Sequence, residues 1–327
     1  TRGCSVRIRP FAALSVVAVS TLLLAGCSGS ADPNATPTPT STASSECLLD
    51  AQPGADSDAI EVTGSGADLA ATLPESLAFE DVERTIVSEG SGDDIASGDL
   101  VSGFYTIYDG STREVLQDSS ETSADDSGAV PIIMDPQQYS LFVAALECAP
   151  VGSTVAMSIP GSAFGEGASP VVIVAETTDF LPTSADGAEQ DPVDGMPTVE
   201  LDDDGAPTIT IPDAEPPTEV QLADLKEGDG PVVEAGDTVF VQYTGVKWSD
   251  GSVFDSSWDR GQPTAFQTTG VVAGFQQALE GQTVGSQVLV VIPPEFGYGA
   301  SEGHELQNET LVFVVDILGV QRAAAQQ

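Results

Sequence analysis

The residues that could do chemistry are aromatic and polar side chains gathered in three turns of the segment 236–320. The turns are Tyr243-Thr244-Gly245, Val253-Phe254-Asp255-Ser256-Ser257 and Phe296-Gly297-Tyr298-Gly299. The chain has four cysteines and one histidine, with no Cys-x-x-Cys pair and no histidine cluster. Zinc sites and thiol-redox centres need such groupings, so we predict no metal site and no cofactor. The turns instead offer rings, hydroxyls and one carboxylate that could line a pocket.

The elements that must position these turns are mostly strands. Alternating or wholly apolar segments predict strands at Thr238–Thr244, Gln287–Ile292 and Leu311–Leu318. Both faces of Leu311–Leu318 are apolar, which predicts a central strand in a sheet that is covered on both sides. One short helix is predicted at Ala273–Glu280, with Gly281 as its terminator. This combination predicts an α+β half-barrel wrapped on a helix.

Five strings in this segment carry a family resemblance. They are VQYTG, FDSSWDRG, VVAGFQQALEG, VGSQVLVVIPPEFGYG and TLVFVVDIL. Their order and spacing resemble the FK506-binding-protein type of peptidyl-prolyl cis-trans isomerase, over roughly the last third of the chain. The resemblance implies an FKBP-type isomerase domain, which we place at residues 197–320.

The implied reaction needs no general acid, general base or nucleophile. Rotation about an X–Pro bond breaks no covalent bond, yet it crosses a barrier of about 18–20 kcal/mol. In the twisted state the amide loses resonance and its carbonyl oxygen becomes less polar. A dry apolar pocket with donors that hold the carbonyl therefore favours the transition state.

The resemblance also implies roles for individual residues. The walls of the pocket would be Tyr243, Phe254, Val271, Val272, Phe275 and Phe313. Phe275 would form the floor, where relatives usually carry tryptophan. The backbone N–H of Val272 and the hydroxyl of Tyr298 would donate hydrogen bonds to substrate carbonyls. Taken singly, such apolar residues are ordinarily just core.

Other residues would border the pocket. Asp255 would pair with Arg260 and bond to Tyr243, orienting rather than transferring protons; the alternative is a plain surface ion pair. Leu306 would make an apolar lid contact. Thr264 stands where many relatives have an aromatic residue, which predicts a roomier pocket. His304, in the acidic loop 300–310, is predicted to be solvated.

An internal repeat predicts a second copy of the fold. Pro74, Glu89-Gly90, Gly98-Asp99 and Tyr105-Thr106 recur 138 residues later as Pro212, Glu227-Gly228, Gly236-Asp237 and Tyr243-Thr244. Further on, Asp118-Ser119-Ser120 is matched to Asp255-Ser256-Ser257. The first copy carries Glu166 in place of Tyr298 and Gln117 in place of Phe254. We therefore predict a degenerate FKBP-like domain at 46–182, a linker at 183–196, and a fold of two tandem FKBP-like antiparallel half-barrels.

The first 45 residues predict export and anchoring. Residues 1–26 combine three arginines with an apolar run, as a signal peptide does; the alternative is an uncleaved anchor helix. Leu24-Ala25-Gly26-Cys27 resembles a bacterial lipobox, which implies cleavage before Cys27 and its diacylation. Residues 27–45 predict a disordered tether. The expected location is the outer face of a bacterial cell membrane, with a lipid anchor.

Cysteine usage and charge narrow the partners. Cys4 would leave with the signal and Cys27 would carry lipid, so Cys47 and Cys148 are predicted to form a disulfide. The formal net charge is −42, with 51 acidic and 9 basic residues. This balance excludes a nucleic-acid partner and argues against electrostatic attachment to anionic lipid. Residues 321–327 are predicted to be a tail.

The prediction for the whole chain is a peptidyl-prolyl cis-trans isomerase that assists the folding of exported proteins. Its partners would be proline-containing unfolded polypeptides and the membrane through Cys27, with macrolide inhibitors of the FK506 class as candidate ligands. The alternative is a non-catalytic peptide-binding or holdase chaperone lipoprotein, which the eroded first copy favours. A solute-binding lipoprotein would need larger α/β lobes than this low helix content provides.

Overall fold

A computed structural model describes residues 51–125, 127–135 and 140–323. The signal peptide, Cys27, the tether and Cys47 lie outside the described residues, so the predictions made for them stay predictions. Cys148 is disulfide-bonded, and its predicted partner Cys47 is among the residues not described. Within the described part of the chain, no helix is both long and apolar enough to cross a membrane.

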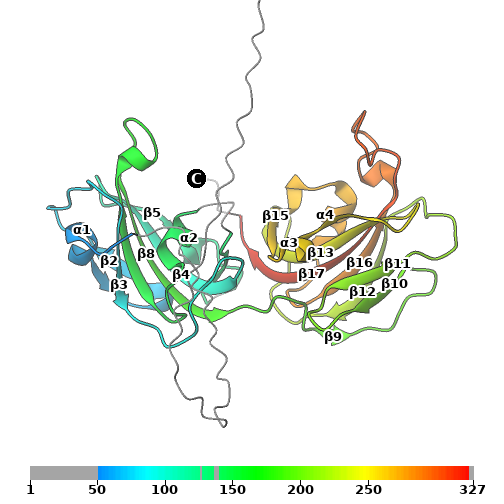
Figure 1. The fold of residues 1–327 in the computed structure, drawn as a ribbon, viewed down its shortest axis with the longest axis horizontal. Helices are drawn as coiled ribbons and strands as arrows, with labels where there is room; N and C mark the ends of the chain where they lie inside the picture. The colour runs from blue at the N-terminus through cyan, green and yellow to red at the C-terminus, as the bar shows by residue number, and fades with distance from the viewer. Residues whose placement is uncertain (1–50, 126, 136–139, 324–327) are drawn as a thin grey trace, which may run out of the picture. The chain divides into compact units, whose positions relative to one another are not determined.

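Two antiparallel sheets of matching topology make up the fold (Figure 1). The first has the order β3-β7-β8-β4-β5, with β6 also paired to β4. The second has the order β14-β13-β17-β16-β12-β9, with β15 also paired to β13. The strands of the first sheet are β3 (Glu83–Ser88), β4 (Leu100–Asp109), β5 (Val115–Asp118), β6 (Val130–Ile133), β7 (Thr154–Ile159) and β8 (Val171–Phe180). Those of the second are β9 (Ala188–Glu189), β12 (Gln221–Glu227), β13 (Thr238–Lys247), β14 (Val253–Ser256), β15 (Thr264–Gln267), β16 (Gln287–Ile292) and β17 (Leu311–Gln321).

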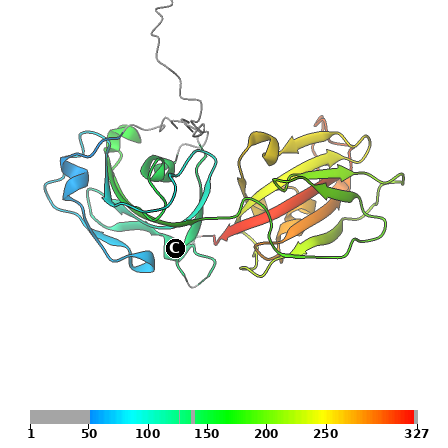
Figure 2. The ribbon, with the colours of Figure 1, turned by 60° about the horizontal axis from the view of Figure 1, so that its bottom comes forward.

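The helices are few and short. The α-helices of the described residues are α1 (Ala55–Ala59), α2 (Leu141–Leu146), α3 (Ser257–Arg260) and α4 (Ala273–Leu279). Single 3₁₀ turns occur at η1 (Gly66–Asp68), η2 (Ser119–Glu121), η3 (Gly161–Ala163), η4 (Thr268–Gly270) and η5 (Pro294–Phe296). Figure 2 shows α2 inside the curve of its sheet. We call the first sheet with α2 the first half-barrel, and the second sheet with α4 the second half-barrel. The predicted α+β fold of two tandem half-barrels is confirmed.

Each half-barrel has an additional small hairpin before its main strands. The hairpins are β1 (Glu61–Thr63) with β2 (Ala70–Thr72), and β10 (Thr198–Leu201) with β11 (Pro207–Thr210). In the second half-barrel, Ile209 of β11 packs on Val312 and Val314 of β17. The opposite face of β17 packs Phe313 and Val315 against α4. Both faces of β17 are therefore covered, as its doubly apolar pattern predicts.

The segment 183–196, predicted as a linker from its composition, packs against the second half-barrel. Its Ala188–Glu189 forms strand β9 on β12. The N–H of Ala185 donates to Oδ2 of buried Asp316 at 2.8 Å. Burial raises the pKa of Asp316, while the hydrogen bonds it accepts from Ala185 and Gln287 lower it. Composition identified the segment as Gly- and Pro-rich, but these long-range contacts are not visible in it.

The strand registers correct one detail of the repeat. Thr106 lies opposite Asp118 in the first sheet, and Thr244 lies opposite Ser256 in the second. Asp118 therefore corresponds to Ser256, and the predicted match of Asp118 with Asp255 is wrong by one residue. The offset of 138 residues persists through this hairpin, so Gln117 stands at the place of Asp255.

Candidate active site

The site begins at Tyr243, in the middle of β13. Its backbone N–H donates to Oγ of Ser257 at 2.8 Å, which fixes the start of α3 beside the strand. Its side chain is almost fully buried, with 4% exposed. Strand β14 pairs with β13 so that Asp255 lies opposite Gly245. The β13–β14 hairpin and α3 thus bring the predicted polar residues to one edge of the sheet.

Three side chains form a closed set of hydrogen bonds at this edge. The Tyr243 hydroxyl donates to Oδ2 of Asp255 at 2.5 Å. Arg260, the last residue of α3, donates from Nη1 to Oδ1 of Asp255 at 2.5 Å and from Nη2 to the Tyr243 hydroxyl at 2.9 Å. The guanidinium carbon also lies 5.4 Å from the centre of the Tyr243 ring. The predicted pairing of Asp255 with Arg260 and Tyr243 is present in the structure.

Electrostatics keep the Tyr243 phenol neutral. Burial, together with the hydrogen bond to Asp255, raises the pKa of Tyr243 to about 12, against a smaller lowering by Arg260. At neutral pH the hydroxyl therefore remains a donor to Asp255. Arg260 and Asp255 are 38% and 44% exposed, so their ion pair holds geometry more than it adds stability.

Aromatic rings converge on one cavity beside this network. The Phe275 and Phe313 ring centres are 4.9 Å apart, those of Phe254 and Phe313 are 5.3 Å apart, and those of Phe266 and Phe275 are 5.7 Å apart. The cavity measures about 420 Å³. Its lining is Tyr243, Phe254, Asp255, Phe266, Gly270, Val271, Val272, Phe275, Tyr298 and Phe313.

Gly245 makes room for this arrangement. A Cβ built on Gly245 would lie 2.7 Å from ring atoms of both Phe254 and Phe313. Real Cβ contacts are never that short, so any side chain here would displace the rings. The positions of Phe254 and Phe313 at the cavity wall therefore depend on this glycine.

Two potential donors face the cavity. Val272 is the residue before α4, and none of the described residues accepts a hydrogen bond from its N–H. The Tyr298 hydroxyl has no hydrogen-bond partner among the residues the structure describes, and its ring lines the cavity. Both residues line the cavity, and their role as donors to substrate carbonyls stays a prediction.

His304 is exposed, as predicted, and it also stacks on Tyr298 with ring centres 4.1 Å apart, while its Nδ1 accepts from the Leu306 N–H at 3.1 Å. Two other residues sit differently from their predicted places. Leu306 itself lies in the core beneath the loop rather than in the cavity lining. Arg260 touches the network but does not line the cavity.

Sequence reasoning missed Phe266. It noted Thr264 as a lost aromatic and predicted a roomier pocket, but Phe266 of β15 supplies a ring to the cavity and Thr264 does not line it. Thr264 therefore does not set the width of this cavity, and the predicted roominess stays a prediction. The signal was present in the alternation of β15, because Thr264 and Phe266 are two residues apart and share a strand face.

The first half-barrel has the same scaffold with a different lining. The N–H of Tyr105 donates to Oγ of Ser119 at 3.2 Å, as Tyr243 does to Ser257. Its hydroxyl accepts from Nε2 of Gln117 at 2.7 Å, at the place of the Asp255 bond. Leu116, which stands at the place of Phe254, is 57% exposed. The predicted replacement of Phe254 by Gln117 is therefore wrong by one residue, because Leu116 stands at that place, but the lining does differ between the two half-barrels.

No group of three or more His, Cys, Asp or Glu side chains placed to hold a metal ion occurs within residues 51–125, 127–135 and 140–323. The cavity lining is almost wholly apolar, and Asp255 is its one carboxylate. That carboxylate is already bonded to Tyr243 and Arg260. The site is therefore arranged to bind and desolvate a ligand rather than to transfer protons.

The chain is similar in sequence to known proteins of one family. The family model of the FKBP-type peptidyl-prolyl cis-trans isomerase matches residues 230–318. An FK506-binding protein of Streptomyces anulatus is 42% identical over 119 residues, which cover 35% of this chain and 96% of that protein. The outer membrane protein MIP of Legionella longbeachae is 37% identical over 110 residues, covering 33% of this chain and 47% of that protein. The crystal structure of FkpA from Escherichia coli matches with a TM-score of 0.31 and 31% identity, over 40% of this chain and 54% of that one.

Proposed function

The chain belongs to the FKBP-type peptidyl-prolyl cis-trans isomerase family, and from this premise we propose that catalysis takes place in the aromatic cavity of the second half-barrel. The observation that carries the proposal is the convergence of six aromatic rings on one open cavity, with two donors at its wall that no described residue pairs. A prolyl ring would enter between Tyr243, Phe266 and Phe313, and would rest on Phe275.

The cavity acts by excluding water from the amide that rotates. In the half-rotated state the amide has lost its resonance, and its less polar carbonyl gains from the apolar surroundings relative to water. The Val272 N–H and the Tyr298 hydroxyl hold carbonyls on either side of the bond. Asp255 and Arg260 fix the orientation of the Tyr243 ring by hydrogen-bonding its hydroxyl. No residue transfers a proton at any step.

A peptide assay tests this assignment. In the intact chain, Asp255→Val combined with Tyr298→Phe removes one orienting bond and one donor. Each hydrogen bond contributes about 0.5–1.5 kcal/mol, so we expect kcat/KM for cis-trans exchange of an Ala-Leu-Pro-Phe peptide to fall by roughly tenfold to a hundredfold. The matched control is Gln117→Val in the first half-barrel, which should leave the rate unchanged. Equal rates for wild type and the double variant would refute the assignment.

We further propose that the protein works outside the cell membrane on exported chains, held by lipid on Cys27. The support is the lipobox-like sequence Leu24-Ala25-Gly26-Cys27, the disulfide at Cys148, and a relative named as an outer membrane protein. Metabolic labelling with a fatty-acid analogue checks this. Label that persists in Cys27→Ser would contradict it.

Unfolded polypeptides with exposed X–Pro bonds are the proposed clients, and macrolides of the FK506 class are proposed inhibitors of the same cavity. Both would occupy the space over Phe275, so the macrolide should compete with a proline peptide. Non-competitive inhibition would place the macrolide elsewhere.

A further inference from the structure

The first half-barrel retains a small cup at the position of the active site. Tyr105, Ile132 and Phe142 stand where the second half-barrel has Tyr243, Phe266 and Phe275; we call these three residues the first cup. The equivalence follows from strand register, because Val101 lies opposite Ile132 as Val239 lies opposite Phe266. The Tyr105 and Phe142 ring centres are 4.5 Å apart. An aromatic remnant of the pocket therefore survives.

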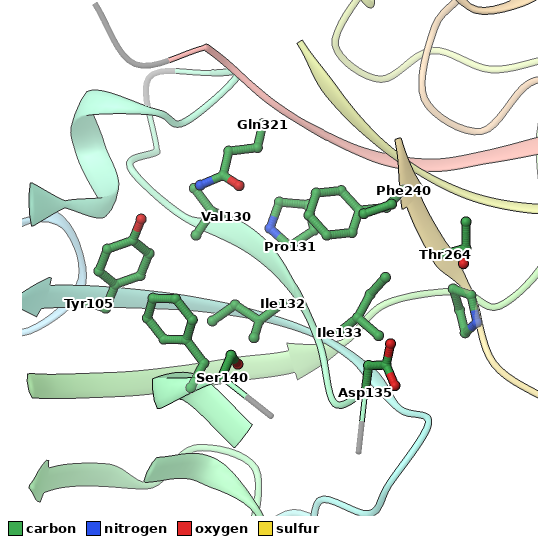
Figure 3. A pocket seen from close by; sticks show the side chains of 13 residues that line it. Tyr105, Val130, Pro131, Ile132, Ile133, Asp135, Ser140, Phe240, Thr264 and Gln321 are labelled. Carbon is green, nitrogen blue, oxygen red and sulfur yellow. The ribbon is translucent and has the colours of Figure 1, made fainter. Parts of the chain in front are cut away.

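The first cup is covered by the end of β17, a strand of the other half-barrel. Both half-barrels belong to one compact unit, Ser45–Gln327. Gln321 donates from Nε2 to Oγ1 of Thr122 at 2.9 Å, and the N–H of Arg322 donates to the Thr122 carbonyl at 2.7 Å. Ser123 and Gln321 also form an antiparallel bridge. Figure 3 shows the Gln321 amide pointing toward Val130 and Tyr105.

Thr122 lies 138 residues before Arg260, at the place of that arginine in the repeat. Arg260 caps Tyr243 from within its own half-barrel. Tyr105 instead makes hydrogen bonds with Thr122 and with Gln321 from β17, which lower its pKa against the larger rise caused by burial. The polar cap of the first cup is thus completed by the other half-barrel.

The Arg322 side chain makes hydrogen bonds to both half-barrels. Its Nη1 donates to Oδ2 of buried Asp237 at 2.5 Å and to the Val232 carbonyl at 2.9 Å, both in the second half-barrel. Its Nη2 donates to the Ala124 carbonyl at 3.3 Å in the first. One side chain therefore bonds to both, in a segment that composition predicted to be a tail.

Apolar contacts continue the same junction. A Cβ on Gly319 would lie 2.7 Å from Cγ of Pro131, so β17 approaches β6 as closely as glycine permits. Leu100 of the first half-barrel shares a core cluster with Phe240 and Leu318 of the second. A residual cavity of about 180 Å³ remains, with walls from both half-barrels, including Tyr105, Val130, Phe142, Phe240, Pro263 and Gln321.

We propose that the first cup is an internal docking site: the end of β17 binds at its rim and leaves a cavity of about 180 Å³, against about 420 Å³ in the second half-barrel, so that client peptides do not bind there in the intact chain. In the first half-barrel, the pocket no longer binds a ligand and instead attaches the isomerase half-barrel. This role explains why the cup keeps Tyr105 and Phe142 yet lacks the open aromatic wall. It also assigns the first half-barrel a function other than that of a peptide-binding chaperone.

Hydrogen–deuterium exchange on the full chain tests the docking. Gln321→Ala with Arg322→Ala removes the contacts from one side, and Pro131→Asp disrupts them from the other without altering the isomerase half-barrel. The matched control is Arg113→Ala with Gln190→Ala, at exposed positions outside the junction. We expect amides of residues 120–133 to exchange at least tenfold faster in both junction variants and at the wild-type rate in the control. Wild-type protection in the junction variants would overturn the proposal.

Photo-crosslinking tests whether client peptides bind at the first cup. The probe is an Ala-Leu-Pro-Phe peptide with a diazirine group, applied to the full wild-type chain. We expect adducts in the second half-barrel and none among residues 100–142. Adducts at the first cup in the wild-type chain would overturn the proposal. The isomerase rate is a separate readout: none of the junction residues lines the active cavity, so failure of the docking proposal leaves the catalytic assignment intact.

Discussion

The two half-barrels share their scaffold bonds and differ in the residues that face the cup. In both, a serine Oγ accepts the N–H of a glycine at the start of the repeat, from Gly90 at 2.9 Å and from Gly228 at 3.0 Å. In both, an aspartate, Asp99 or Asp237, accepts a hydrogen bond at Oδ2 from the backbone N–H of the residue three positions before it. The bonds that build the fold were duplicated with it, and only the lining diverged.

The clearest divergence is at one position on the central strand. Gly245 lets the rings of Phe254 and Phe313 pack directly over the strand, whereas its counterpart in the first half-barrel is Ile107, which is buried. The counterpart of Phe313 is Ile173, also buried. A branched aliphatic side chain in the first half-barrel takes the volume that the rings of Phe254 and Phe313 occupy beside Gly245 in the second. The comparison teaches that an open pocket here requires a missing side chain as much as it requires aromatic ones.

Displacing the rings at the wall of the active cavity should produce the largest loss of isomerase activity. Gly245→Ile copies the first half-barrel, and overpacking of this kind costs about 1–3 kcal/mol. If that cost falls on substrate binding, kcat/KM for the proline peptide drops by roughly tenfold to a hundredfold. Ile107→Val is the control, expected to lower stability by about 1 kcal/mol with no change in rate. A fully active Gly245→Ile variant would break the comparison.

Removing the shared scaffold serine should weaken both halves alike. Ser119 and Ser257 are buried acceptors for Tyr105 and Tyr243. Losing such a partner costs about 1–3 kcal/mol, so Ser119→Ala and Ser257→Ala should lower the unfolding free energy similarly in denaturant titrations. Only Ser257→Ala should also raise KM, because only that tyrosine lines an active cavity. A KM change in Ser119→Ala would show that the halves are not functionally separate.

Alkaline pH should test the burial of Tyr243 at the active cavity. Unfolded tyrosine has a pKa near 10, whereas Tyr243 holds its proton to about 12. Between these values the unfolded chain binds fewer protons than the folded one, so the unfolding free energy falls as pH rises from 10 to 12. Tyr243→Phe should remove part of this fall in unfolding free energy, on the order of 1–2 kcal/mol. An unchanged slope in thermal melts would contradict the burial argument.

The smallest effect is expected from the exposed ion pair. Arg260→Ala leaves Asp255 bonded to Tyr243 and should cost under about 1 kcal/mol of stability. Since Thr122 occupies this place in the first half-barrel, Arg260→Thr is the more informative replacement. We expect a modest rise in KM with little change in melting temperature. A melting temperature many degrees lower would mean that the pair supports the fold.

Much of the second half-barrel could be predicted from sequence, because its strands and turns are specified locally. The apolar run Leu311–Leu318 predicts a doubly covered strand, and its two faces indeed pack in two cores. Phe266 was not predicted, because the resemblance places the expected aromatic at Thr264, two residues away on the same face of β15. Asp255 and Arg260 were predicted together from the family resemblance, and they lie five residues apart on one hairpin and helix.

The junction could not be predicted, for a physical reason. Gln321 and Arg322 follow the last apolar strand and resemble a polar tail by composition. Their partners, Thr122 and Ala124, lie nearly two hundred residues earlier. Only the folded chain brings Gly319 against Pro131. Contacts of this range depend on tertiary packing, and no local pattern records them.

The central claim is that isomerisation is confined to the second half-barrel, and one NMR measurement tests it most directly. The intact chain, labelled at its aromatic rings, is titrated with an Ala-Leu-Pro-Phe peptide while cis-trans exchange of the peptide is followed. We predict accelerated exchange together with shifts of Tyr243, Phe275 and Phe313, while Tyr105 and Phe142 stay unchanged. Accelerated exchange with shifts at Tyr105 and Phe142 and none at Phe275 would contradict it.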